Sequence, residues 1–400
     1  MNPALANLQL YPFQRLAALK APIEQTTPYA KHISLSIGEP KHAPPEFIVD
    51  ALASANSITA SLGAYPATRG NPALRQSIAA WLGRRFGAKV DPETQLLPVN
   101  GTREALFSFA QTVLSGATDS LALLPNPFYQ IYEGAVLLRG AAPVFMPALS
   151  INGYKPDFSA IPESIWQRCE LVFICSPGNP SGAVMHAEEL AALLELRDRY
   201  DFVIAADECY SEIYDPAAPA PCGLLEACTA TGRTDFRGCV VFHSLSKRSN
   251  LPGLRSGFVA GDARLIEPYF NYRTYHGCAM PVLTQAASEL AWNDESHVEA
   301  NRSAYAEKFA AVVPILNRCL DVSAPEAAFY LWPKTPANDQ QFAVDLFTHT
   351  NITVLPGSFL SRPGSDGKIP GENHIRIALV AELEECVEAA QRICEFIESR

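Results

Sequence analysis

Short apolar runs alternate with stretches of helical spacing along most of the chain, and this alternation sets the expected architecture. From about residue 96 onward, each apolar run is followed by a stretch whose apolar positions recur with the helical period. The predicted strands are 96–99, 121–124, 143–146, 171–175, 202–206, 240–242 and 258–260. This rhythm is typical of an α/β domain with a mostly parallel, seven-stranded sheet sandwiched by helices.

The two ends of the chain follow a different pattern, which predicts a second, smaller unit. Segment 33–37 alternates like a half-exposed strand, and helical spacing marks 12–20, 47–54 and 72–86. Helices predominate over 269–320, after which strands at 328–332, 353–355 and 375–378 interleave with helices at 339–348 and 381–399. We therefore expect an N-terminal arm that joins the smaller unit (1–45), a large domain (46–290) and a small α+β domain (291–400).

Composition narrows the class of protein. The 400 residues are 48% hydrophobic and 18% charged, enough to bury a large core. The formal net charge of −11 offers no basic face for nucleic acid. The chain has no basic-then-apolar start and no apolar run of membrane-spanning length, so we expect a cytoplasmic protein. Its ten cysteines form no C-x-x-C pair, and several lie in or beside predicted strands, so we expect core residues and no metal site.

The stretch that carries most chemistry is F-H-S-L-S-K at 242–247, where a predicted buried strand ends. A lysine at the mouth of a buried strand loses water, which lowers its pKa and makes its neutral amine available as a nucleophile. The hydroxyls of Ser244 and Ser246, with Arg255 shortly after, suit a phosphate. Together with the amine of Lys247 they suggest a site for pyridoxal 5'-phosphate (PLP), although a solvated surface turn has the same composition.

The loop after the first strand of the large domain contains Gly101, Thr102 and Arg103, at the start of a predicted helix. Glycine lets the backbone approach a ligand, and the free N–H groups of a helix start attract an anion. Thr102 would equally serve as an ordinary helix cap.

Three other loops follow predicted strands and carry polar or aromatic side chains. Asn179 lies in a loop that is rich in turn-forming residues. Two interpretations are open: Asn179 donates to a ring oxygen of the cofactor, or the loop is an ordinary β-to-α turn. Asp207 ends a buried strand and needs a cation, either a protonated pyridine nitrogen near Tyr210 or an ordinary lysine or arginine. Tyr129 follows the strand 121–124 and could stack on a planar cofactor or belong to the core.

In chain order, these segments resemble the class I/II PLP-dependent aminotransferases of fold type I, and the resemblance covers nearly the whole chain. Its motifs are G-T-R at 101–103, P-x-Y at 127–129, N-P-S-G at 179–182, D-E-x-Y at 207–210, S-L-S-K at 244–247, G-x-R-x-G at 253–257 and a late arginine at 376. The resemblance implies the fold type I architecture, PLP as cofactor and a homodimer with active sites at the interface.

The resemblance also implies a role for each matching residue. Lys247 would hold PLP and move the substrate proton, and Asp207 would keep the pyridine nitrogen protonated. The implied ring contacts are Tyr210, Asn179 and Tyr129. The implied phosphate group comprises Gly101, Thr102, Arg103, Ser244, Ser246 and Arg255, with Tyr65 reaching across from a second copy of the chain. The implied substrate contacts are Arg376, Asn179 and the backbone near Gly38.

One segment is more specific about the substrate. The G-E-P-K-H-x-x-P stretch at 38–45 resembles that of the N-succinyldiaminopimelate aminotransferases of bacterial lysine synthesis. That resemblance implies transfer of an amino group from N-succinyl-LL-2,6-diaminopimelate to 2-oxoglutarate, giving N-succinyl-2-amino-6-oxopimelate and glutamate. Because this substrate carries extra carboxylates, Lys41, His42 and Arg69 are candidates for additional cations.

Other functions stay open at this stage. Aspartate, aromatic, alanine and LL-diaminopimelate aminotransferases would share every cofactor residue, and a fold type I PLP lyase would share the lysine, aspartate and serines. A non-catalytic PLP-binding regulator would need an added DNA-binding domain, for which the sequence shows no basic face.

Overall fold

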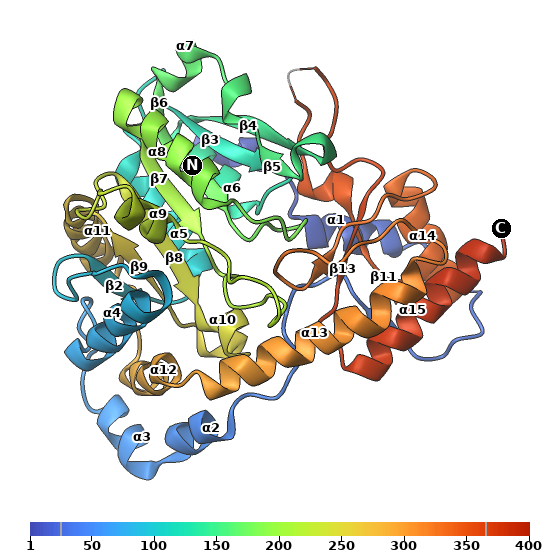
Figure 1. Cartoon of the computed structure of the whole chain (residues 1–400), viewed down its shortest axis with the longest axis horizontal. Helices are drawn as coiled ribbons and strands as arrows, with labels where there is room; N and C mark the ends of the chain where they lie inside the picture. Colours follow the sequence, from blue (N-terminus) through green and yellow to red (C-terminus); the bar gives the residue numbers. More distant parts are fainter. Residues whose placement is uncertain (25, 365) are drawn as a thin grey trace.

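In the computed structural model of the chain, which describes residues 1–24, 26–364 and 366–400, the larger part is built on one sheet (Figure 1). Its strand order is β2-β9-β8-β7-β6-β3-β4-β5. The strands are β2 (Leu96–Val99), β3 (Leu121–Asn126), β4 (Ala142–Leu149), β5 (Lys155–Pro156), β6 (Cys169–Cys175), β7 (Val203–Asp207), β8 (Cys239–Ser244) and β9 (Gly257–Gly261).

The predicted seven-stranded, mostly parallel sheet is confirmed, with one short strand added at its edge. Strands β4, β3, β6, β7 and β8 run parallel, whereas β9 runs antiparallel to both β8 and β2. The added strand β5 pairs antiparallel with β4 over two residues. A strand of two residues is too short to show a hydrophobic pattern, so β5 was not predicted.

Helices cover both faces of the sheet, because successive strand residues point to opposite sides. Leu96 packs in the core under α4, α8, α9 and α12, while its neighbour Leu97 packs in the core under α5, α6 and α11. The helices of the larger part are α2 (Glu46–Ala53), α3 (Ala55–Leu62), α4 (Pro72–Phe86), α5 (Thr102–Val113), α6 (Ile131–Arg139), α7 (Glu163–Trp166), α8 (Ala187–Tyr200), α9 (Leu224–Ala230), α10 (Leu245–Arg248), α11 (Ala263–His276) and α12 (Val282–Asn293).

The smaller part joins the two ends of the chain. Strand β1 pairs parallel with β11, with Ile33 opposite Ile352, and β13 lies antiparallel between β10 and β12. The long helix α13 runs from the larger part into the smaller one (Figure 1). The elements are α1 (Pro12–Lys20), β1 (Ile33–Ser34), α13 (Ser296–Leu316), β10 (Tyr330–Leu331), α14 (Asp339–Thr350), β11 (Ile352–Thr353), β12 (Leu355–Pro356), β13 (Ile375–Ala378) and α15 (Leu383–Glu398).

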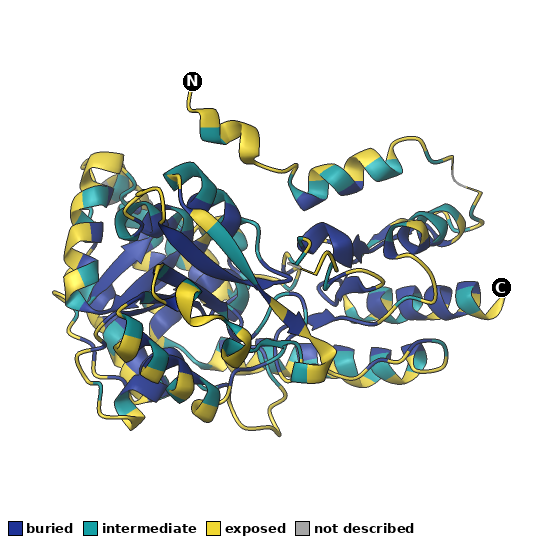
Figure 2. Cartoon of the chain, turned by 90° about the horizontal axis from the view of Figure 1, so that it is seen from above, coloured by how far each residue is buried: buried dark blue, intermediate teal, exposed yellow. Residues whose placement is uncertain are grey.

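Short 3-10 helices complete the secondary structure, at Pro3–Asn7, Ser150–Asn152, Phe158–Ala160, Pro252–Leu254 and Gly357–Leu360. The first of these and α1 form an N-terminal arm, largely exposed, that runs along one side of the molecule (Figure 2). The domain boundaries at residues 45 and 290 stay predictions. None of the described helices is long and apolar enough to span a lipid bilayer.

Candidate active site

A cavity of about 570 Å³ lies where β3, β6, β7 and β8 end, facing the smaller part of the chain. Because the carboxyl ends of parallel strands meet at one edge of a sheet, residues far apart in sequence converge there. The structure brings these predicted residues to its wall: Gly38, Thr102, Arg103, Tyr129, Asn179, Asp207, Tyr210, Ser244, Ser246, Lys247, Arg255 and Arg376. Of the predicted site residues, Gly101 lies beside this wall, and Tyr65 lies apart from it.

Lys247 stands on α10, the short helix that directly follows β8. Its Nζ atom donates a hydrogen bond to the carbonyl oxygen of Gly38, at 2.7 Å. Burial lowers the pKa of Lys247 to about 8, and the nearby Arg376 acts in the same direction. A lysine with this pKa is neutral in an appreciable fraction near neutral pH, which the sequence predicted for a nucleophilic amine.

Asp207 is the last residue of β7 and is only 4% exposed. Its carboxylate accepts hydrogen bonds from the hydroxyl of Tyr132 at 2.7 Å and from the backbone N–H of Cys209 at 3.3 Å. Burial raises the pKa of Asp207, and among the described residues no lysine or arginine forms an ion pair with it. A buried carboxylate on a cavity wall without a cation suits a positively charged ligand group.

Hydroxyl and N–H donors also line the cavity wall, at the starts of α5 and α10. Thr102 begins α5, a helix of 12 residues, and Ser244 caps α10 by accepting from the backbone N–H of Ser246 at 3.1 Å. The Ser244 hydroxyl also donates to that of Ser246 at 2.9 Å. The side chain of Arg255 donates to the carbonyl of Pro252 and forms no ion pair within the described part of the chain. These donors and this charge suit a phosphate.

Gly101 precedes α5 with a φ of 81°, a conformation that favours glycine. A Cβ atom at this position would overlap the guanidinium of Arg255. Gly101 therefore lets Arg255 reach the start of α5, although Gly101 itself does not line the cavity.

Arg376 on β13 is 3% exposed, and its guanidinium donates to two neutral oxygens of the described residues. These are Oδ1 of Asn179 at 2.8 Å and the carbonyl of Ser36 at 2.6 Å. Its Nε atom has no hydrogen-bond partner within the described part of the chain. Its charge is therefore available for a carboxylate, which a guanidinium binds with two parallel hydrogen bonds.

Aromatic hydroxyls line the rest of the wall. The hydroxyl of Tyr210 lies 2.8 Å from that of Tyr330, and the Tyr330 ring stacks under Arg376, whose guanidinium carbon is 4.5 Å from the ring centre. Burial raises the pKa of Tyr210, Tyr330 and Tyr129, so all three stay protonated and able to donate.

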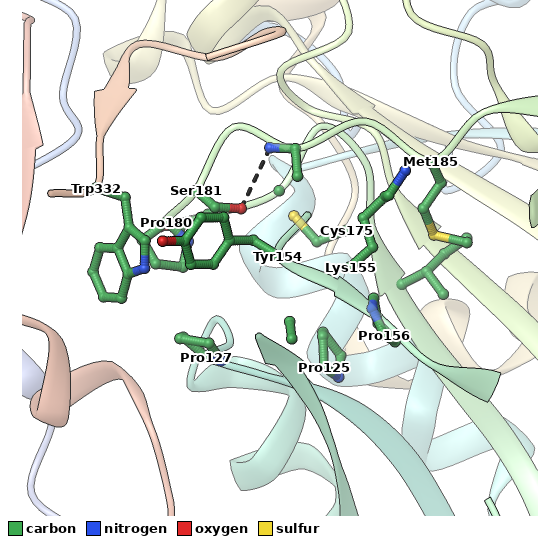
Figure 3. A pocket seen from close by; sticks show the side chains of 15 residues that line it. Pro125, Pro127, Tyr154, Lys155, Pro156, Cys175, Pro180, Ser181, Met185 and Trp332 are labelled. Carbon is green, nitrogen blue, oxygen red and sulfur yellow. Dashed lines mark hydrogen bonds between the residues drawn. The ribbon is translucent and has the colours of Figure 1, made fainter. Parts of the chain in front are cut away.

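The loop after β6 that carries Asn179 also closes a second, much smaller pocket, of about 30 Å³ (Figure 3). Figure 3 shows Tyr154 and Trp332 beside Pro180 and Ser181, whose hydroxyl accepts a hydrogen bond from the backbone of Ala183 at 3.3 Å. This volume holds about one water molecule. This pocket therefore lies against the Asn179 loop and is too small for an amino-acid substrate.

Known proteins share this fold and this order of residues. The sequence model of the family described as "Aminotransferase class I and II" matches residues 30–393. The chain belongs to this family. It is 30% identical over 397 residues to the LL-diaminopimelate aminotransferase of Nitratidesulfovibrio vulgaris, covering 98% of each chain.

Solved aminotransferases superpose on nearly the whole structure. The aminotransferase of Neisseria meningitidis is 48% identical with a TM-score of 0.94, over 99% of this chain and 100% of that one. The aminotransferase AspB of Helicobacter pylori is 36% identical with a TM-score of 0.89, over 98% of this chain and 100% of that one. The fold type I architecture expected from the sequence is confirmed.

Class I and II aminotransferases depend on PLP, and the cavity fits that cofactor in two respects. Among the described residues, no lysine or arginine pairs with the buried carboxylate of Asp207, which therefore suits a protonated pyridine nitrogen. The donors at Thr102, Ser244 and Ser246 face the same cavity as the amine of Lys247, so a phosphate and a reactive amine have their partners on one wall.

The distal substrate candidates Lys41, His42 and Arg69 do not line the cavity of this aminotransferase. Arg69 forms an ion pair with Glu267 at 2.6 Å, and His42 is turned inward, with its Nε2 atom 2.5 Å from Nζ of Lys308. Lys41 is exposed. Long-range partners that spacing does not reveal bind Arg69 and His42, and the expected contact of these three cations with the substrate stays a prediction.

Tyr65 is fully exposed on the loop after α3. Its expected contact with the phosphate of a second copy stays a prediction.

Several residues at the cavity carried no sequence signal. Tyr11 and Phe13 come from the N-terminal arm, and Tyr330 comes from a strand of the smaller part. Tyr11 lies beside Arg103 on the cavity wall, with its ring centre 5.1 Å from the guanidinium carbon of that residue. Such contacts join segments far apart in the chain, so periodicity does not predict them.

One group of ligand-type residues lies outside the cavity. Among the described residues, Glu104, His276 and Cys278 are close enough together to offer ligand atoms to a metal ion. Both carboxylate oxygens of Glu104, however, accept hydrogen bonds from Arg273 at 2.8 Å, and this guanidinium opposes the binding of a cation.

Proposed function

We propose that this aminotransferase transfers an amino group from N-succinyl-LL-2,6-diaminopimelate to 2-oxoglutarate, giving N-succinyl-2-amino-6-oxopimelate and glutamate. The observation that supports the proposal is the charge of the cavity. Arg103, Lys247, Arg255 and Arg376 line it against the carboxylates of Glu39 and Asp207, although the whole chain carries a formal charge of −11. An excess of cations in an acidic protein favours anionic ligands, here a cofactor phosphate together with a substrate carboxylate.

The G-E-P-K-H segment adds to this support through its position. Gly38 and Glu39 lie on the cavity wall, and Gly38 accepts the hydrogen bond of Lys247. The segment whose sequence resembles the N-succinyldiaminopimelate aminotransferases therefore lies where a substrate would meet the amine.

In this proposal the catalytic residues are Lys247, Asp207 and Tyr210. Bound PLP supplies an electron sink that makes the Cα proton of an amino acid acidic. Nζ of Lys247 takes up and returns that proton, for which a pKa of about 8 is well matched to neutral pH. Asp207 holds the ring nitrogen in its protonated form by its negative charge, and the Tyr210 hydroxyl donates to the ring oxygen.

The remaining residues bind and orient. The amide nitrogen of Asn179 would donate to the ring oxygen of the cofactor, and Tyr129 would stack on the ring, while Oδ1 of Asn179 accepts from Arg376. Arg376 binds the α-carboxylate of the substrate with two hydrogen bonds, beside the backbone of Gly38. The residues proposed to hold the phosphate are Gly101, Thr102, Arg103, Ser244, Ser246 and Arg255, with Tyr65 from a second copy. This assignment requires a homodimer, and we propose a cytoplasmic location.

Free LL-diaminopimelate is the second candidate donor, because curated relatives such as that of Nitratidesulfovibrio vulgaris carry this activity in their names. Glu39 favours it in one respect, since this carboxylate lines the cavity without an ion-pair partner in the described part of the chain and would attract a distal ammonium. Acylation removes that ammonium and adds a carboxylate, so the two donors differ in the charge of the distal end.

A panel of amino donors with 2-oxoglutarate, scored by glutamate formation, tests the proposal. The panel comprises N-succinyl-LL-diaminopimelate, LL-diaminopimelate, aspartate, alanine and phenylalanine. We expect the highest kcat/KM for the succinylated donor, by about tenfold or more over LL-diaminopimelate, the size of one favourable ionic hydrogen bond. A higher kcat/KM for any other donor would refute the proposed substrate. Incubation with glutamate alone separates a transaminase from a PLP lyase, because only the transaminase gives 2-oxoglutarate and the pyridoxamine form.

A further inference from the structure

A groove of about 640 Å³ runs beneath helix α1 and adjoins the active-site cavity. Its walls are α1, the segment 34–37, the end of α14 and β11. Phe13 and Ile37 line both the groove and the cavity, so the two hollows meet at these side chains. The groove therefore continues the active site away from Lys247.

The far end of the groove is cationic and polar. Nζ of Lys20, in the last turn of α1, donates to Oγ1 of Thr353 at 2.6 Å and lies 3.9 Å from the ring centre of Phe347. Nε2 of His32 lies 2.8 Å from the same Oγ1 atom. The hydroxyl of Thr353 accepts a hydrogen bond from Lys20 and donates its own proton to a ring nitrogen of His32. Because a ring nitrogen that accepts carries no proton, Lys20 holds the positive charge of this group.

Lys20 has no acidic partner in the described part of the chain. Burial lowers its pKa, and the pKa of His32 is lowered by burial and by the charge of Lys20. A lysine at a helix C-terminus ordinarily points to water and complements the helix dipole. Here the ammonium is instead folded against a hydroxyl and an aromatic face, at one end of a groove. This arrangement leaves room and charge for an anion.

The walls between the cavity and Lys20 are largely apolar. Phe13, Leu16 and Ala17 line the groove from α1, and Ile23 follows the helix. Phe13 and Lys20 are seven residues apart on one helix, about 10 Å along its axis. A ligand that starts at the cavity and reaches Lys20 must therefore combine an extended chain of methylene groups with a terminal anion.

We propose that this groove binds the acyl chain of the substrate, with the terminal succinyl carboxylate on the ammonium of Lys20 and the methylene groups against Leu16. This inference rests on the proposed function and assigns its specificity to one lysine. It also gives α1 a role in substrate selection that the motifs around Lys247 and Arg376 do not cover.

The test compares two donors that differ by the terminal methylene and carboxylate groups, N-succinyl-LL-diaminopimelate and N-acetyl-LL-diaminopimelate, on the PLP-loaded enzyme. We expect wild type to prefer the succinylated donor in kcat/KM, and Lys20→Met to lower this preference by about tenfold, mainly through KM. Lys20→Arg keeps the charge and is expected to retain the preference. Lys31→Met is the matched control, because Lys31 is an exposed lysine paired with Glu385 away from the groove. An unchanged preference in Lys20→Met would overturn the inference.

A second measurement does not depend on turnover. N-succinyl-L-norleucine and N-acetyl-L-norleucine carry the distal half of the proposed substrate and no reacting amine. Calorimetry should give tighter binding of the succinyl compound to wild type, with the advantage lost in Lys20→Met and kept in Lys31→Met. If wild type uses neither acylated donor, the proposed function fails, and this comparison still decides whether Lys20 binds the acyl carboxylate. Equal affinities for the two norleucine compounds in wild type would reject the groove as their site.

Discussion

The Nζ atom of Lys247 donates a hydrogen bond to the carbonyl oxygen of Gly38, at 2.7 Å. Lys247 follows strand β8 of the large sheet, whereas Gly38 follows the segment that joins the smaller part through β1. The bond therefore ties the two parts together at the active site. It also places the G-E-P-K-H segment where a change of one side chain affects the reacting amine.

The variant Gly38→Ala tests how closely the G-E-P-K-H segment packs against Tyr330. A Cβ atom at position 38 would overlap the hydroxyl of Tyr330, which is bonded to that of Tyr210 at 2.8 Å. We expect kcat/KM to fall about tenfold or more, because the displaced hydroxyls leave their positions over the cavity. Adding Tyr330→Phe removes the overlapping atom and should restore part of the loss. A Gly38→Ala variant with wild-type kinetics would contradict this reading.

Lys247→Ala should abolish transamination together with the visible absorption of bound PLP. The reason is that Lys247 is the amine on the cavity wall whose pKa of about 8 suits both attachment of the cofactor and proton transfer. Absorption spectra and glutamate formation measure the two effects, and circular dichroism checks the fold. A coloured, active variant would refute the assignment of Lys247.

Asp207→Asn should bind PLP yet lose most of its turnover, by about a hundredfold or more, because a neutral amide does not hold the ring nitrogen protonated. Tyr132→Phe is the milder companion. It removes the hydroxyl that donates to Asp207 at 2.7 Å, so the pKa of Asp207 should rise further and turnover fall about tenfold. Spectrophotometric PLP titration separates binding from turnover. Wild-type rates in Asp207→Asn would exclude the proposed electrostatic role.

The sequence predicted the strand ends well, because short apolar runs mark buried parallel strands and polar residues directly follow them. Asp207 and Ser244 lie where that rule placed them, at the ends of β7 and β8. Helix α4 also begins and ends at the predicted residues, with Pro72 at its first position and a glycine after its last.

What the sequence did not predict depends on contacts between distant segments. Tyr330 approaches Tyr210 across 120 residues, and Arg69 pairs with Glu267 across 198. The groove at Lys20 exists only because α1 packs over a strand more than 300 residues away, at Thr353. Hydrophobic periodicity describes one helix or strand at a time, so it does not predict contacts between distant segments.

The pKa of Lys247 makes the stability of the PLP-free enzyme depend on pH. Burial lowers this pKa to about 8, whereas an unfolded lysine titrates near 10.4. Between these pH values the unfolded chain binds more protons, so the free energy of unfolding rises with pH. Below about pH 8 the amine is charged in both states and carries the full burial penalty, on the order of 3 kcal/mol.

Lys247→Met removes that titration. We expect the PLP-free variant to be more stable than PLP-free wild type at about pH 7, with the difference shrinking as pH rises from about 8 to 10.5. Urea unfolding of the two proteins at several pH values measures the difference. A difference that stays constant over this range would show that Lys247 is not buried as a weakly basic amine.

His42 and Lys308 form a buried pair whose two members should respond unequally to mutation. Lys308 is 2% exposed, burial lowers its pKa, and its Nζ atom lies 2.5 Å from Nε2 of His42 without an acidic partner in the described part of the chain. Nδ1 of His42 lies 2.9 Å from Oδ1 of Asn301, whose amide donates to the backbone carbonyl of Lys247 at 3.1 Å. The pair therefore supports the segment that carries the reacting lysine.

Removing His42 leaves a buried ammonium without its acceptor, which costs about 2–3 kcal/mol, whereas removing Lys308 takes the charge away together with its need for a partner. We therefore expect His42→Leu to lower Tm more than Lys308→Met. The double variant should recover part of the loss of His42→Leu, because the unpaired charge is gone. Thermal unfolding of the three variants with PLP bound measures this order. A double variant that loses the sum of the two single losses would mean that the two side chains act independently, and that Lys308 does not depend on His42 for its burial.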